Sequence, residues 1–197
     1  MKKIDARGKT CPQPVMMTKA AVTDQVRDIQ VFVDNAIAMK NVCRLLEKMG
    51  FSFSTSGNEN ELVIEGHRDS VAQDHEEQYS KVEKGLQDVA VFISRAIIGG
   101  DDSQLGEVLM KSFLGTLSQM EAPPRTVALM NEGIRLALKG TSSCEHLQEL
   151  EEKGVQILVC GTCSNHFGLT DQVNVGVISN MFDITEALME ASKILSI

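Results

Sequence analysis

The amino-acid sequence predicts an α/β protein built from an N-terminal two-layer βαβαββ sandwich and a C-terminal three-layer α/β/α open parallel sheet. In residues 1–70, short segments of alternating apolar and polar residues are separated by segments with helical apolar spacing. Residues 87–197 instead contain nearly continuous apolar runs, which are typical of strands buried on both faces of a parallel sheet. Residues 71–86 are polar and of mixed charge, which indicates a linker between two domains.

The elements expected in the first domain follow the order strand, helix, strand, helix, strand, strand. Asn35 is a suitable N-cap for the second helix, and Gly50 is a suitable stop. Phe and Ser alternate in the fifth element, and the sequence GNEN can form the hairpin turn to the sixth. In chain order the expected elements are residues 3–7, 15–26, 28–34 and 35–50, and the strands FSFSTSG and ELVIEGH.

In the second domain, apolar strands alternate with helices, which is the pattern of an open parallel sheet. We expect helices over 103–121, 144–153 and 180–195, the first capped by Asp102 or Ser103. The expected strands are DVAVFISRAI, TVALMN, VQILVCG and NVGVIS.

The net charge of −8 argues against a protein that holds nucleic acid through its general electrostatic field, because such binding needs a basic face. No apolar run approaches the ~18 residues that span a bilayer, and the opening Met-Lys-Lys-Ile-Asp is not followed by the apolar stretch of a signal peptide. We therefore expect a cytoplasmic protein without membrane association. In a reducing compartment, cysteines are read as buried, metal-binding or reactive thiols before they are read as disulfides.

Cys11 lies in the segment CPQP, directly before residues with helical spacing. Because a residue before proline is biased away from the helical conformation, the helix is expected to begin near Pro14. The sulfur of Cys11 would then lie near free backbone N–H groups and the positive end of the helix dipole, which favours the nucleophilic thiolate. Local chemistry alone supports a loop cysteine without a function equally well, with Pro12 and Pro14 serving as helix punctuation.

Cys160 and Cys163 form a C-x-x-C pair at the end of an expected buried strand, where reactive residues of open α/β sheets cluster. Three chemistries compete for this pair: a thiol–disulfide couple, a metal site completed by His166, or a sulfur acceptor with a resolving thiol. Three ligands without a second C-x-x-C disfavour a structural zinc site, so no metal is expected. A strand-end cysteine packed as a small hydrophobe is the remaining alternative.

The stretch DARGKTCPQPVMMTKAAV resembles the signature of the TusA/SirA-like sulfur-carrier family, and the resemblance extends over residues 1 to about 70. The family's cysteine accepts a persulfide sulfur and passes it to the next protein. Lys9 stands where the family usually has leucine, which adds a positive charge near the sulfur. The resemblance implies that the acceptor is Cys11, that the motif prolines are Pro12 and Pro14, and that Asp5 and Gly8 belong to the approach.

Residues 88–197 resemble the DsrE-like family, whose members carry sulfur on a cysteine at a strand end. In this resemblance Cys160 matches the family cysteine and Cys163 does not, although the physical arguments for the two thiols nearly balance. A TusA-like domain followed by a DsrE-like domain is similar to the YedF group, which is described as sulfurtransferase-like and linked to selenium metabolism.

These resemblances imply a relay protein that carries sulfur or selenium as a persulfide on Cys11 and Cys160, in selenium metabolism or in sulfur trafficking of the tRNA-thiolation type. Implied partners are a sulfur donor such as a cysteine desulfurase and a downstream acceptor protein, and association of like chains through the C-terminal domain is a further option. No cofactor is expected, and whether the chain is an enzyme stays open. The alternatives are a regulatory or scaffold module and a Cys160–Cys163 thiol–disulfide oxidoreductase.

Overall fold

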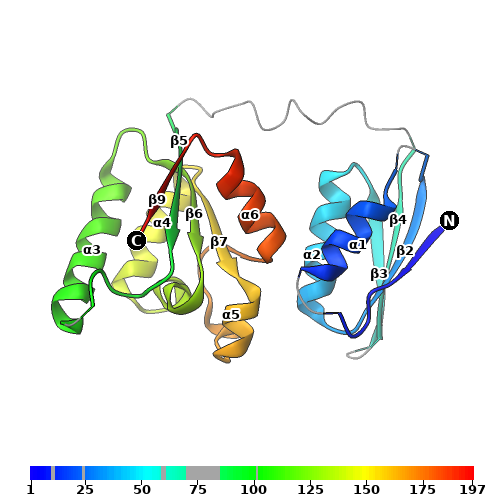
Figure 1. Ribbon diagram of the computed structural model, residues 1–197, viewed down its shortest axis with the longest axis horizontal. Helices are drawn as coiled ribbons and strands as arrows, with labels where there is room; N and C mark the ends of the chain where they lie inside the picture. The colour runs from blue at the N-terminus through cyan, green and yellow to red at the C-terminus, as the bar shows by residue number, and fades with distance from the viewer. Residues whose placement is uncertain (10–11, 24, 59–60, 70–84, 101) are drawn as a thin grey trace. The chain divides into compact units, whose positions relative to one another are not determined.

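The computed structural model describes residues 1–9, 12–23, 25–58, 61–69, 85–100 and 102–197. The chain divides into two compact units, Met1–Ser80 and Lys81–Ile197 (Figure 1). Most of the expected linker, and the last two residues of the expected hairpin turn GNEN, lie outside the described residues.

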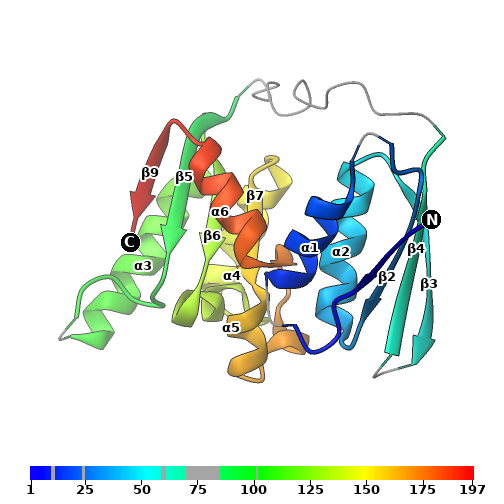
Figure 2. The ribbon, with the colours of Figure 1, turned by 45° about the vertical axis from the view of Figure 1, so that its right-hand side comes forward.

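The first unit has the expected βαβαββ order and a four-stranded mixed sheet. Strands β1 and β2 are parallel, whereas β4 runs antiparallel to both β2 and β3, so the strand order is β1-β2-β4-β3. Figure 2 shows both helices packed together on one face of this sheet. The elements are β1 (Lys2–Asp5), α1 (Gln13–Ala21), β2 (Asp28–Val33), α2 (Ala36–Lys48), β3 (Ser52–Asn58) and β4 (Glu61–His67).

Local chemistry explains where the helices of this unit begin and end. The side chain of Asn35 accepts a hydrogen bond from the Ala38 N–H at 2.8 Å, which confirms the predicted N-cap of α2. Gly50 follows that helix with a φ of 76°, a left-handed conformation that suits glycine. Helix α1 begins at Gln13, one residue before Pro14, near which its start was expected. It ends at Ala21, so the expected helix over 15–26 extended too far.

The core of the first unit lies between the sheet and the helices. Alternate residues of β2 point inward, and helix α2 contributes a stripe of apolar side chains at helical spacing. This packing positions the end of β2 next to the segment that follows β1, because Ala6 donates its N–H to the Phe32 carbonyl at 2.9 Å. The buried residues include Ile29, Val31, Val33, Val42, Leu46 and Ile64.

The second unit has an all-parallel five-stranded sheet of order β8-β7-β6-β5-β9, so the predicted three-layer fold class is confirmed. Figure 1 shows α3 and α4 on one side of this sheet and α6 on the other. The elements are β5 (Gln87–Ile93), α3 (Ser103–Gln119), β6 (Pro124–Leu129), the 3-10 helix η2 (Asn131–Ala137), α4 (Ser142–Glu152), β7 (Gln156–Cys160), α5 (Gly161–His166), η3 (Thr170–Gln172), β8 (Val177–Ser179), α6 (Met181–Glu190) and β9 (Lys193–Ser196).

One predicted element of the second unit was wrong at its end. The expected helix 180–195 stops at Glu190, and the following residues form β9, which extends the sheet beside β5. The sequence around Lys193 is compatible with a helix, so the local apolar spacing does not reveal the strand. Pairing with the open edge of β5 determines the conformation of these residues. Asp102 caps α3 as predicted, accepting a hydrogen bond from the Leu105 N–H at 2.9 Å.

In the described part of the chain, no helix combines the length and apolar character required to cross a bilayer.

Candidate functional site

The C-x-x-C pair lies at the carboxyl edge of the parallel sheet. Cys160 is the last residue of β7, and α5 begins at the next residue, so Cys163 lies in the first turn of that helix. The neighbouring strand β6 ends at Leu129, and the chain then enters η2 at Asn131. The carboxyl ends of neighbouring parallel strands therefore gather both thiols and the start of η2 at one edge, where open α/β sheets place their sites.

Cys160 is almost completely buried, with 1 % of its surface exposed. Burial, with a smaller contribution from the neighbouring Cys163 side chain, raises the pKa of its thiol to about 12. The backbone N–H groups of Cys163 and Thr162 oppose the shift but are too weak to offset burial. A sulfur carrier needs an accessible thiol that ionises readily, and Cys160 has neither property in this structure. Its role as a carrier stays a prediction.

Cys163 is half-buried, and its sulfur accepts a hydrogen bond from the backbone N–H of Asn131 at 3.1 Å. Asn131 has a φ of 47°, a left-handed conformation that asparagine tolerates better than most residues. Cys163 is thus the more accessible thiol of the pair and the one with a donor directed at it from another element.

The start of η2 is held against the end of β5. The N–H of Met130 donates to the Ile93 carbonyl at 3.0 Å, and the Gly133 N–H returns to the Met130 carbonyl at 2.9 Å. A Cβ at Gly133 would lie only 2.3 Å from the Ile93 oxygen, so glycine permits this approach. Two backbone hydrogen bonds therefore fix the peptide group of Asn131 beside Cys163.

Within the described ranges, no three His, Cys, Asp or Glu side chains are grouped to hold a metal ion. The ligand set of Cys160, Cys163 and His166 is not assembled in this structure. The ring of His166 instead packs edge-on against Phe167, with 5.2 Å between the ring centroids. Arg135 covers that phenylalanine, its guanidinium carbon 5.0 Å from the ring centroid.

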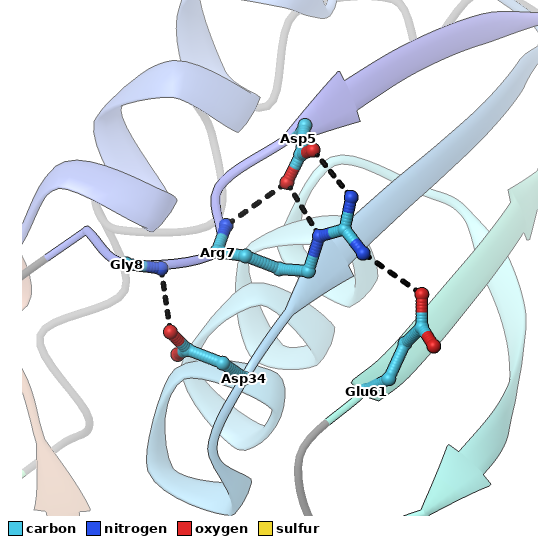
Figure 3. Close-up of polar contacts among 5 residues, drawn as sticks. All are labelled: Asp5, Arg7, Gly8, Asp34 and Glu61. Atoms are coloured by element: carbon cyan, nitrogen blue, oxygen red, sulfur yellow. Dashed lines mark hydrogen bonds and ion pairs between the residues drawn. The ribbon is translucent and has the colours of Figure 1, made fainter.

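Cys11 lies outside the described residues, but the segment that leads to it is defined (Figure 3). Arg7 binds the carboxylate of Asp5 through two side-chain hydrogen bonds, of 2.9 Å from Nε and 2.6 Å from Nη2. Its remaining nitrogen reaches Oε1 of Glu61 on β4 at 2.8 Å. The side-chain hydrogen bond from Arg7 lowers the pKa of Asp5 to about 2, so Asp5 is a carboxylate that positions Arg7 at neutral pH.

Gly8 is the second fixed point of this approach. It has a φ of 69°, and its N–H donates to the carboxylate of Asp34 directly after β2 (Figure 3). That backbone hydrogen bond is the main reason why the pKa of Asp34 is lowered. The chain of Gly8 is thereby tied to the end of the neighbouring strand three residues before Cys11.

On the other side of Cys11, the start of α1 is also defined. Pro12 is the N-cap residue and Pro14 is the second residue of the helix, buried against the core. The Met16 N–H donates to the Pro12 carbonyl at 3.1 Å, which closes the first turn. The structure therefore describes the supports of the predicted site on both sides of Cys11 but not the thiol itself.

The two remaining cysteines are core residues. Cys43 is 9 % exposed and Cys144 is 2 % exposed, and burial raises the pKa of both thiols. Sequence patterns did not reveal Asn131 or Asp34 as parts of the candidate sites. Asp34 directly follows β2, and Asn131 lies two residues after the end of β6. This position after a strand end is the sequence signal that could have identified them.

Family comparisons match the two units separately. Residues 2–66 match the model of sulfurtransferase TusA, and residues 110–197 match the model of the DsrE/DsrF-like family. The comparison with curated proteins found no match.

Three solved structures are similar to parts of the chain. A SirA-like protein from Desulfitobacterium hafniense is 28% identical, with 34% of this chain and 96% of that chain covered and a TM-score of 0.32. The ychN protein from E. coli is 17% identical, with 57% and 100% covered and a TM-score of 0.41. A conserved protein of unknown function from Bacteroides thetaiotaomicron is 18% identical, with 56% and 95% covered and a TM-score of 0.40. The chain therefore contains a region that matches the sulfurtransferase TusA model, followed by a region that matches the DsrE/DsrF-like model.

Proposed function

We propose that this protein is a sulfur-relay, sulfurtransferase-like protein that carries persulfide sulfur on Cys11 and on the Cys160/Cys163 pair. One observation carries the proposal: each of the two matched regions contains a cysteine directly before a helix or in its first turn. The first site follows a strand-end segment anchored by Asp5 and Asp34 and precedes the proline-bounded start of α1. The second lies at the carboxyl edge of a parallel sheet.

The transfer requires only thiol chemistry. The thiolate of Cys11 attacks the outer sulfur of a persulfide on the donor protein, so an S–S bond forms on Cys11 while the donor S–S bond breaks. The donor leaves as a thiolate, and a downstream thiol repeats the step on Cys11. The reaction is favoured by a depressed thiol pKa and by access, and it needs no metal and no organic cofactor.

The proposed donor is a cysteine desulfurase-type protein, and the proposed recipient is an acceptor protein in a reducing compartment such as the cytoplasm. Selenium chemistry is parallel, because a selenopersulfide transfers its outer atom by the same attack. The YedF-type arrangement of the two regions motivates this selenium role, as it motivates sulfur delivery of the tRNA-thiolation type. A comparison of the two elements as cargo separates the sulfur and selenium roles.

The test is intact-mass spectrometry of the full chain after incubation with a cysteine desulfurase and either cysteine or selenocysteine. We expect a mass gain of one sulfur atom that maps to Cys11 and is lost in Cys11→Ser. The matched control is Cys43→Ser, which removes a buried thiol of the same unit and should load as the unaltered chain does. Loading that is equal in Cys11→Ser would refute the assignment, and a folded chain that accepts no sulfur supports the scaffold alternative.

A thiol–disulfide oxidoreductase is the second candidate, because the Cys160 and Cys163 side chains interact directly. Such an enzyme would reduce or oxidise disulfides of other proteins in the absence of any persulfide. An insulin-type disulfide reduction assay without a sulfur donor distinguishes the two activities.

A further inference from the structure

We propose that Cys163 is the thiol of the second unit that accepts sulfur, and that Cys160 then displaces this sulfur as sulfide while closing a Cys160–Cys163 disulfide. The inference rests on the proposed function and assigns different roles to the two thiols. It also specifies the product, because sulfur then leaves this site as free sulfide and not as a persulfide on another protein.

Access separates the two thiols. A donor persulfide must bring its outer sulfur into contact with the attacking thiolate, and a thiol with 1 % of its surface exposed does not allow that contact. Cys163 is half-buried and lies one turn further along, in α5. An external persulfide therefore meets Cys163 first.

Positioning supports the same order. The Asn131 N–H donates a hydrogen bond to the sulfur of Cys163 at 3.1 Å, and this contact orients the accepting sulfur. The peptide group of Asn131 is fixed by the Met130–Ile93 hydrogen bond, so this donor is already in place before the donor protein arrives. Asn131 is a positioning residue for the accepting thiol.

Proximity gives Cys160 its role. Its side chain interacts directly with that of Cys163, while burial keeps it from thiols of other proteins. Cys160 ends a strand, and Cys163 lies three positions later in the first turn of α5. This is the spacing of a C-x-x-C pair, which forms disulfides readily. Among the described residues, the sulfur within reach of the buried Cys160 is therefore the one on Cys163.

The step balances as a thiol–disulfide exchange. The Cys160 thiolate attacks the inner sulfur, which belongs to Cys163, so the Cys160–Cys163 bond forms and the persulfide S–S bond breaks. The outer sulfur leaves as HS⁻, and the proton lost by Cys160 passes to solvent. A dithiol reductant supplies two electrons and two protons to restore both thiols. Burial of Cys160 slows this discharge at neutral pH, and the rate rises with pH, because the thiolate fraction rises about tenfold per pH unit below the pKa.

The experiment uses the full chain carrying Cys11→Ser, with inorganic polysulfide as the sulfur source and excess polysulfide removed before measurement. Sulfide release is followed with a sulfide-selective probe, and the state of each cysteine is read by peptide mass. We expect the parent chain to gain one sulfur on Cys163, release it as sulfide and lose two hydrogens as the disulfide forms. The rate of sulfide release and the rate of disulfide formation should increase together as pH is raised.

Three variants in this background test the roles. Cys160→Ala, which avoids placing a hydroxyl in an apolar position, should load on Cys163 and retain the sulfur; Cys163→Ser should not load in this unit. Cys144→Ser is the matched control, since it alters another buried thiol of the same unit and should behave as the parent. Circular dichroism spectra of all variants verify that each is folded.

Two results overturn the inference. In the first, Cys163→Ser takes up sulfur in this unit and Cys160→Ala does not, which assigns acceptance to Cys160. In the second, Cys160→Ala and the parent retain equal amounts of sulfur. If Cys160→Ala is unfolded, the parent chain alone tests the step through its sulfide release and its disulfide formation. Sulfide that is released without formation of the Cys160–Cys163 disulfide also refutes the step. Failure here leaves Cys11 loading from a desulfurase intact, whereas failure of the proposed function abolishes that loading as well.

Discussion

The backbone N–H of Asn131 donates a hydrogen bond to Sγ of Cys163, with 3.1 Å between the two atoms, and Asn131 adopts a φ of 47° in doing so. A residue with a side chain rarely adopts this conformation, and strained backbone of this kind is concentrated at functional sites. The relationship links the end of β6 to the start of α5, so a backbone change at one strand end should alter the chemistry of a thiol at the next.

The first prediction concerns the conformation of Asn131. Asn131→Val should disfavour the left-handed backbone by about 1–2 kcal/mol, move the N–H away from sulfur and slow alkylation of Cys163 at neutral pH several-fold. Asn131→Gly keeps the N–H and adopts the conformation without strain, so it should retain the rate. The measurement is iodoacetamide labelling of Cys163 against pH, with sites mapped by peptide mass. Identical pH profiles for the two variants would show that this hydrogen bond does not influence the thiol.

The second prediction compares the thiols of the first unit. Cys43 should label slowly because burial, with a smaller effect of the charge on Glu47, raises its pKa. We predict that Cys11, placed before the proline-bounded start of α1, labels much faster in the folded chain at neutral pH. Time-resolved labelling with peptide mapping measures both rates in one sample, and unfolding in urea should bring the two rates together. Equal rates in the folded chain would argue against an activated thiol at Cys11.

Much of the fold could be predicted from the sequence, because apolar periodicity reports burial directly. Residues such as Val31 and Val159 lie in strands whose patterns distinguish a half-covered sheet from one covered on both faces. Lys193 and its neighbours could not be placed in this way, since their strand exists only through pairing with β5. Propensity in such short segments is decided by tertiary contacts.

The site of the second unit could be predicted in position but not in chemistry. The local pattern predicts Cys160 and Cys163 at the end of a buried strand, and the structure places Cys160 last in β7 and Cys163 in the first turn of α5. Their difference in burial, and the donor from Asn131, depend on how η2 packs on the end of β5. No local pattern encodes that packing, so the physical arguments from sequence left the two thiols nearly equal.

The third prediction concerns the approach to Cys11. Asp34→Ala removes the acceptor for the Gly8 N–H and should slow sulfur loading of Cys11, because the segment before the cysteine loses one of its two anchors. Asp34→Asn retains an acceptor oxygen and should load at a rate nearer to that of the parent. Loading from a cysteine desulfurase is timed by intact mass. Similar loading of all three proteins would mean that the anchor does not position the thiol.

The fourth prediction is a pH dependence centred on His67 at the end of β4. Its two ring nitrogens contact Asp28 at 2.7 Å and Asp69 at 3.0 Å, and the hydrogen bond to Asp28, followed by that to Asp69, raises its pKa above the usual 6.5. A raised folded-state pKa contributes stability that is fully present below the unfolded pKa and is lost as pH rises through the folded pKa. The effect is small because the pair is half-exposed.

The comparison for this prediction is the parent chain against His67→Gln, with thermal unfolding midpoints recorded from about pH 5.5 to about pH 9 across the histidine range. The parent should be more stable at the acidic end, and the difference should shrink as pH rises. High salt should also reduce the difference, because the ion pairs are exposed. A difference that stays constant with pH would place the contribution of His67 in packing and not in charge.

The last prediction is that the two units fold independently. Apolar core residues are grouped within each unit: one cluster includes Val31 and Leu46, and the other includes Val127 and Leu147. The pieces to express are 1–75 and 86–197, the second beginning at Leu86 because that residue packs against the core of its unit. Each piece should unfold cooperatively, and each transition should coincide with one of those of the full chain.

The second piece also tests whether like chains associate, since helix α3 and strand β9 expose apolar side chains that include Leu105, Val108 and Ile194. Its unfolding midpoint is therefore measured over a range of protein concentrations, because self-association makes the midpoint rise with concentration. A concentration-independent midpoint indicates a stable monomer. A piece that is unfolded at every concentration, while the full chain is folded, contradicts independent folding.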